Sequence, residues 1–176
     1  MERKGTYIAF DANGMKDQVN SNLHTFRQLA EWQRNWPSRF NFTNMDSIEF
    51  AAEHDDFLES TMKAKMLKQM AEADRLLVVV SPVINTESHI LNWQISRAVN
   101  RFHLPVIIAY FGLESVTEET IQEYWTWLPY KFKKYITRYS WAQMAHIPLT
   151  KAKLERALHT FSARRQSYPW DATTIF

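Results

Sequence analysis

The stretch Leu76-Leu-Val-Val-Val80 decides the fold class, and Ser81-Pro-Val-Ile-Asn-Thr-Glu-Ser88 follows it directly. A run that is apolar on both faces predicts a strand in the centre of a parallel sheet, covered on both sides. The polar segment after it predicts a loop. Residues 88–102 then show apolar side chains at helical spacing. The unit is therefore a buried strand, a loop and a helix.

The same unit repeats outward from this stretch in both directions. We expect further strands at 6–10, 39–43 and 105–110, a short fifth strand at 146–150, and helices at 16–34, 59–73 and 150–163, with Thr150 as the N-cap of the last helix. Residues 44–56 are polar and acidic and predict a loop. Alternating strands and helices predict an α/β fold, with a central parallel sheet of about five strands and helices on both faces.

Length and composition favour one domain over residues 1–176, with a core at 5–112 and a C-terminal helical extension at 113–176 that holds the fifth strand. The first residues lead straight into a strand and predict no signal peptide. The apolar runs are too short for a membrane span. We expect a cytoplasmic protein that does not associate with membranes.

The residues that are rare in the chain exclude several kinds of site. There are no cysteines, which excludes disulfides, thiolate zinc sites and thiol nucleophiles. The six histidines lack metal-ligand spacing such as HExxH, so we expect no metal. The three glycines are too far apart for a glycine-rich phosphate loop.

Polar side chains follow several predicted strands, where parallel sheets bind ligands. Candidate ligand contacts are Asp11, Asn13, Asp46, Ser81, Asn85 and Ser88. The last three open a predicted helix, whose N-terminus can hold an anion such as a diphosphate. Plain helix capping is the alternative interpretation of the same residues.

Three segments together resemble TIR-like domains. They are the stretch 76–98 with its Ser88-His-Ile-Leu-Asn-Trp-Gln-Ile95 segment, the opening Tyr7-Ile-Ala-Phe-Asp11, and Pro105-Val-Ile-Ile-Ala109. The similarity covers residues 5–112, and the closest subgroup is the TIR-like proteins of bacterial Thoeris anti-phage systems. It implies a flavodoxin-like TIR fold.

The resemblance also implies a function. TIR-like enzymes cleave the bond between nicotinamide and ribose in NAD, and Thoeris members make an ADP-ribose-derived second messenger that activates a separate effector. NAD would be the substrate, and self-association is a further implication. Phe10 and Asp11 would flank the nucleotide, and Trp93 would shape the pocket, although a helix tryptophan more often belongs to the core.

The family's catalytic glutamate falls on position 94, where this chain has Gln94. A carboxylate would stabilise positive charge on the ribose in the transition state, whereas an amide keeps the shape and loses the charge. Four interpretations stay open: an engineered Glu-to-Gln change, a natural binding-only homologue, a shifted register in which Glu87 supplies the carboxylate, and an ordinary polar helix residue. The TIR-like assignment as a whole requires side chain 94 to face the ribose of a bound dinucleotide, in a cleft at the top of the sheet beside Phe10.

The aromatic and basic segment 124–139 allows two interpretations. Bases stack on aromatic rings and lysines contact phosphates, which would favour nucleic acid. The formal net charge of only +2 argues against this, so we expect an amphipathic helix instead. A flavodoxin-like binding protein of another class remains the third functional alternative, beside the enzyme and the non-catalytic TIR-like module.

Overall fold

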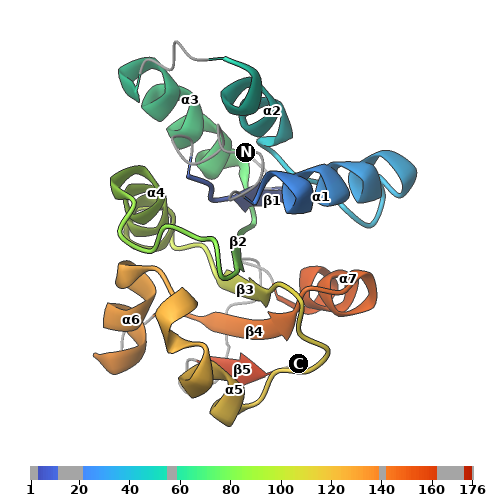
Figure 1. The fold of residues 1–176 in the computed structure, drawn as a ribbon. Helices are drawn as coiled ribbons and strands as arrows, with labels where there is room; N and C mark the ends of the chain where they lie inside the picture. The colour runs from blue at the N-terminus through green and yellow to red at the C-terminus, as the bar shows by residue number, and fades with distance from the viewer. Residues whose placement is uncertain (1–3, 12–21, 55–58, 139–141, 162–172, 176) are drawn as a thin grey trace.

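The computed structural model describes residues 4–11, 22–54, 59–138, 142–161 and 173–175 (Figure 1). Its core is one parallel sheet of five strands in the order β1-β2-β3-β4-β5. The strands are β1 (Thr6–Ile8), β2 (Arg75–Val80), β3 (Val106–Tyr110), β4 (Met144–Pro148) and β5 (Thr173–Ile175). The predicted α/β class and parallel sheet are confirmed.

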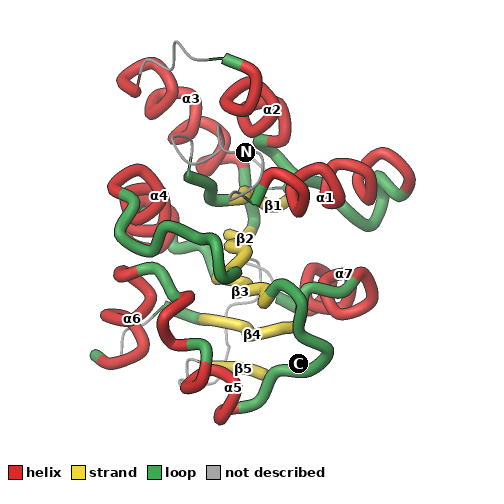
Figure 2. The backbone as a smooth tube through the Cα atoms, viewed as in Figure 1, coloured by secondary structure: helices red, strands yellow, loops and turns green. Residues whose placement is uncertain are grey.

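Helices cover both faces of this sheet, as expected. They are α1 (Leu23–Asn35), α2 (Met45–Glu53), α3 (Glu59–Glu72), α4 (His89–Asn100), α5 (Glu118–Glu123), the 3-10 turn η2 (Trp125–Trp127), α6 (Tyr130–Thr137) and α7 (Lys151–Thr160). Figures 1 and 2 show α1 and α7 on one side of the sheet, α4 and α6 on the other, and α2 and α3 beyond its β1 edge.

The strands predicted from continuous apolar runs are confirmed. β2 and β3 pair in register, with Val78 opposite Ile108, and every residue of 76–80 and 106–110 is buried. Burial on both faces explains why these strands lack the alternating pattern of a half-exposed sheet.

The strand expected at 39–43 is wrong. In this segment only Phe42 pairs with β1, through a single β-bridge to Thr6. The bridge consists of two backbone hydrogen bonds, from Thr6 N to Asn41 O (2.7 Å) and from Thr43 N to Thr6 O (2.9 Å). The chain enters α2 at Met45. The alternating pattern at 39–43 arises because Phe40 and Phe42 are buried while their neighbours face outward.

The loop expected at 44–56 is also wrong, because most of it is the helix α2. Met45, Ile48 and Ala51 are spaced three apart and are buried together. Acidic side chains on the outer face gave the segment its loop-like composition. Residues 55–58 lie outside the described part.

Gly5 shows how closely the segment before α2 approaches β1. Its φ is +91°, and a Cβ there would lie 2.9 Å from the backbone oxygen of Asn41. A side chain would clash with the backbone that forms the residual ladder, and this φ also favours glycine.

The sheet has the expected number of strands but a different last member. The segment predicted as strand 146–150 is β4, which begins two residues earlier, and the fifth strand is β5, where Thr173 pairs with Met144. Residues 162–172 lie outside the described part.

The start of α7 and the packing of α6 match the prediction. The Thr150 side chain accepts a hydrogen bond from the Lys153 backbone N–H, which confirms it as the N-cap of α7. In α6 Phe132 is buried and α4 lies alongside, so the helix expected within 124–139 packs one face inward. The helix expected at 16–34 is described only from Leu23 onward.

A buried polar pair links β3 and β4. The Tyr110 hydroxyl lies 3.0 Å from Nδ1 of His146, and both residues are fully buried. Nε2 of His146 has no hydrogen-bond partner in the structure, and burial lowers the pKa of this ring to about 4. The imidazole is therefore neutral near pH 7.

Candidate nucleotide-binding site

The candidate site lies where the chain changes direction across the sheet. From β1 the chain passes to the bridge at Phe42 on one side, and it returns to β2 on the other side. Ligands of open parallel sheets bind at such a switch point, beyond the carboxyl ends of the strands. Phe10, Asp11 and Ser81 lie there, whereas Asn13 falls outside the described residues.

Gln94 is fully buried on α4, directly against the end of β1. Its Nε2 donates to the Phe10 backbone O at 2.6 Å and to the Ile90 O at 3.1 Å. Its Oε1 accepts from the Tyr7 hydroxyl at 2.8 Å and from the Phe10 backbone N–H at 3.3 Å. The side chain thus bonds both polar backbone groups of Phe10.

These partners determine which terminal atom of the Gln94 side chain is Oε1 and which is Nε2. A backbone N–H can only donate and a backbone carbonyl can only accept, so oxygen must face the Phe10 N–H and nitrogen must face the carbonyls. A carboxylate in the same rotamer would place an oxygen 2.6 Å from the Phe10 O. It would be repelled there unless it were protonated. The observed environment therefore matches a glutamine.

The Tyr7 hydroxyl adds a neutral donor to this cluster. Burial raises the pKa of Tyr7 well above its ordinary value, and a hydrogen bond with the Asn44 side chain opposes this only in part. Gln94 is therefore hydrogen-bonded to a neutral phenol and to backbone groups. Side chain 94 is turned toward the β1 backbone, and its direct bonds leave no space for a ribose between it and Phe10.

Asn44 holds the same strand from its edge, a role that the sequence analysis did not predict. Its Oδ1 accepts from the Ile8 N–H at 2.9 Å and its Nδ2 donates to the Ile8 O at 2.7 Å. The side chain thereby replaces the next residue of the missing strand. An asparagine directly before a helix resembles an N-cap in sequence, yet this one makes no capping bond.

Ser81 and Ser88 are both engaged within the protein. The buried Ser81 hydroxyl donates to Asn22 Oδ1 at 2.6 Å, joining the loop after β2 to the start of α1. Ser88 Oγ accepts from the Leu91 N–H at 3.3 Å, so the capping interpretation of Ser88 is confirmed.

The loop between β2 and α4 is held from the side of α6. Asn92 Nδ2 donates to the Thr86 O at 2.9 Å, and Asn92 Oδ1 accepts from the Lys131 N–H at 3.0 Å. Asn85 is exposed, and its Oδ1 accepts from the Glu87 N–H at 3.2 Å. The exposed Glu87 lies on this loop and is not in the buried cluster around Gln94.

Two other predicted site residues face α3. Trp93 is half-buried, with Nζ of Lys63 5.2 Å from its ring centroid, so it points away from its neighbour Gln94. Asp46, on the first turn of α2, pairs with Lys65 Nζ at 2.7 Å and accepts from Gln69 Nε2 at 3.1 Å. In these contacts Asp46 connects α2 to α3.

Within the described ranges, no three His, Asp or Glu side chains gather closely enough to hold a metal ion. No helix in the part of the chain that the structure describes has the length and apolar character to cross a membrane.

The fold and this edge of the sheet define a flavodoxin-like α/β domain with a polar switch point. Comparison with known proteins does not extend this assignment to a family. No protein-family model matches the chain, and no curated protein sequence matches it.

Proposed function

We propose that this chain is a TIR-like module that binds NAD or an ADP-ribose-type nucleotide at the carboxyl edge of the sheet and does not cleave it. The observation that carries the proposal is the amide of Gln94, whose donors and acceptors are all matched where the family has its glutamate. Without a carboxylate at 94, the positive charge that develops on the ribose has no stabilising partner there.

The binding half of the proposal is supported by the position of α4. Its N-terminus opens at the switch point, where the free amides and the helix dipole favour an anion such as a diphosphate. Ser88 caps one amide, and the loop 82–87, in which four of six residues are exposed, leads into the same turn. Phe10 and Asp11 follow β1, and the Phe10 backbone is bonded to Gln94 on the same helix.

The rival proposal is an NAD glycohydrolase or cyclase whose active form carries glutamate at 94. Its product would be an ADP-ribose-derived signal for a separate effector in cytoplasmic anti-phage defence, as the TIR-like resemblance implies. It requires the carboxylate to rotate away from Phe10 into the ligand site. The non-cleaving module is favoured because the amide already satisfies every polar group around it.

The test compares the chain as it stands with Gln94→Glu. Each is incubated with NAD, nicotinamide release is followed by chromatography, and binding of NAD and of ADP-ribose is measured by calorimetry. We expect both proteins to bind nucleotide and neither to release nicotinamide. Release by Gln94→Glu alone would establish the rival proposal.

Two further outcomes are equally decisive. Nicotinamide release by the unmodified chain that Glu87→Gln abolishes would show that Glu87 supplies the carboxylate. Absence of binding by either protein at millimolar NAD and ADP-ribose would overturn the nucleotide assignment.

A further inference from the structure

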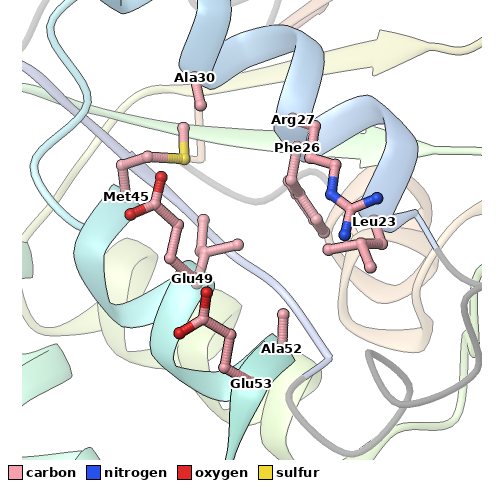
Figure 3. Close-up of a pocket in the computed structure, with 9 residues that line it drawn as sticks. Leu23, Phe26, Arg27, Ala30, Met45, Glu49, Ala52 and Glu53 are labelled. Carbon is pink, nitrogen blue, oxygen red and sulfur yellow. The ribbon is translucent and has the colours of Figure 1, made fainter.

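A groove runs between α1 and α2, outside the candidate nucleotide site. Figure 3 shows one end of it, a cavity of about 380 Å³. It is lined by Leu23, Phe26, Arg27, Ala30, Met45, Ile48, Glu49, Ala52 and Glu53. We call this feature the α1–α2 groove.

The groove continues beyond the part in Figure 3. A second cavity of about 430 Å³ shares Ala30, Met45 and Glu49 with the first and extends to Arg34 and Pro37. Together the two cavities follow the whole of α1, which at 13 residues is about 20 Å long. The groove therefore has the length of a short helix of about 13 residues.

Its floor is apolar and its walls carry opposite charges. Leu23, Phe26 and Ile48 are buried at the base. The exposed side chains of Arg27 and Arg34 rise from α1, and those of Glu49 and Glu53 rise from α2. Figure 3 shows Arg27 on one side of the cavity and the two glutamates on the other.

We propose that the α1–α2 groove binds an amphipathic helix of a partner protein. The helix would place an apolar stripe on the floor, basic residues against Glu49 and Glu53, and acidic residues against Arg27 and Arg34. Apolar side chains at positions i, i+3, i+4 and i+7 supply such a stripe. The groove lies outside the candidate nucleotide site, so helix binding there does not depend on nucleotide binding.

A helix fits this groove better than an extended peptide. Both walls are helices, whose backbone groups are already bonded internally, so no strand can be added by backbone pairing. Recognition must come from side chains, and the opposed charged walls favour one direction of the bound helix because each flank meets its opposite charge.

Three synthetic helical peptides of about 14 residues test the proposal. All share one apolar stripe; one has a basic and an acidic flank, one has two basic flanks, and one has two acidic flanks. Affinity is measured by fluorescence anisotropy at low and physiological salt. The mixed-flank peptide is expected to bind most tightly.

The decisive variant is Glu49→Lys with Glu53→Lys, which makes both walls basic. It should weaken the mixed-flank peptide roughly tenfold and make the acidic-flank peptide the tightest ligand. Glu114→Lys with Glu123→Lys gives the same charge change on exposed residues outside the groove and should leave the ranking unchanged. Ala52→Trp should block all three peptides, and circular dichroism verifies folding of each variant.

Some results would overturn the proposal. One is that no peptide saturates below 1 mM (an affinity of roughly 4 kcal/mol). Another is that the variant with Glu49→Lys and Glu53→Lys (the wall variant) ranks the three peptides in the same order as the control variant with Glu114→Lys and Glu123→Lys. Self-association of the chain in sedimentation experiments, lost in the wall variant, would identify a second copy as the occupant and reject the partner helix.

Discussion

Gln94 and Phe10 are joined by two hydrogen bonds that run in opposite directions. The Gln94 Nε2 donates to the Phe10 O at 2.6 Å, and its Oε1 accepts from the Phe10 N–H at 3.3 Å. A side-chain amide thus does what a neighbouring strand would do for the end of β1. Gln94 links helix α4 to the strand that leads into the candidate site.

Gln94→Glu should destabilise the fold by about 2 kcal/mol near pH 7, because it replaces a donor with an acceptor opposite two carbonyls. Those carbonyls and burial raise the pKa of the new carboxyl above about 4.3, the value of an unfolded glutamate. The variant is therefore least impaired below pH 4 and loses stability as the pH rises. Urea denaturation at pH 4 and pH 7 measures this, with the exposed Gln122→Glu as control. Equal losses at both pH values would show that the side chain has left the cluster.

Asn44→Ala should lower the free energy of unfolding by about 3 kcal/mol, because it leaves both the N–H and the carbonyl of Ile8 unpaired in a buried position. Asn35→Ala, at an exposed position on α1, should change it by less than about 0.5 kcal/mol. Denaturant titrations of the two variants test this. Similar values for both would contradict the role assigned to Asn44.

Because His146 is buried in its neutral form, we expect the free energy of unfolding to fall in mild acid. Its folded pKa of about 4 lies below the ordinary value of 6.5, so the unfolded chain binds the proton more readily between these values. The contribution of neutral His146 to the free energy of unfolding is therefore fully present above pH 6.5. It falls by up to roughly 3 kcal/mol as the pH drops toward 4. Unfolding measured from pH 4 to pH 7 for the chain and for His146→Leu checks this, and the variant should show a shallower slope. An unchanged slope would assign the acid sensitivity to other groups.

Asp46→Asn should leave NAD affinity unchanged if the chain binds NAD as proposed. Its carboxylate is occupied by Lys65 and Gln69 on α3, and such an exposed pair contributes less than about 1 kcal/mol to stability. Calorimetry with NAD and a thermal melt test both expectations. If Asp46→Asn lost NAD binding without losing stability, Asp46 would contact the ligand, as the sequence analysis expected.

Local sequence patterns were enough to predict the parts of the fold that depend on neighbouring residues. The apolar runs of β2 and β3 predict buried parallel strands, and Thr150 and Ser88 predict helix starts, because hydrophobic period and capping depend on a few neighbouring residues. The location of the candidate site at the carboxyl edge of the sheet follows from the same alternation of strands and helices.

The roles of the polar residues depend on contacts between segments that are far apart in the sequence. Gln94 and Phe10 are 84 positions apart and Asn44 and Ile8 are 36 apart, so no local pattern records their bonds. The same holds for β5, which pairs with β4 across a long stretch of chain, and for the α1–α2 groove. A buried amide has its role fixed by which donors and acceptors the fold places around it, and in this protein those groups come from distant segments.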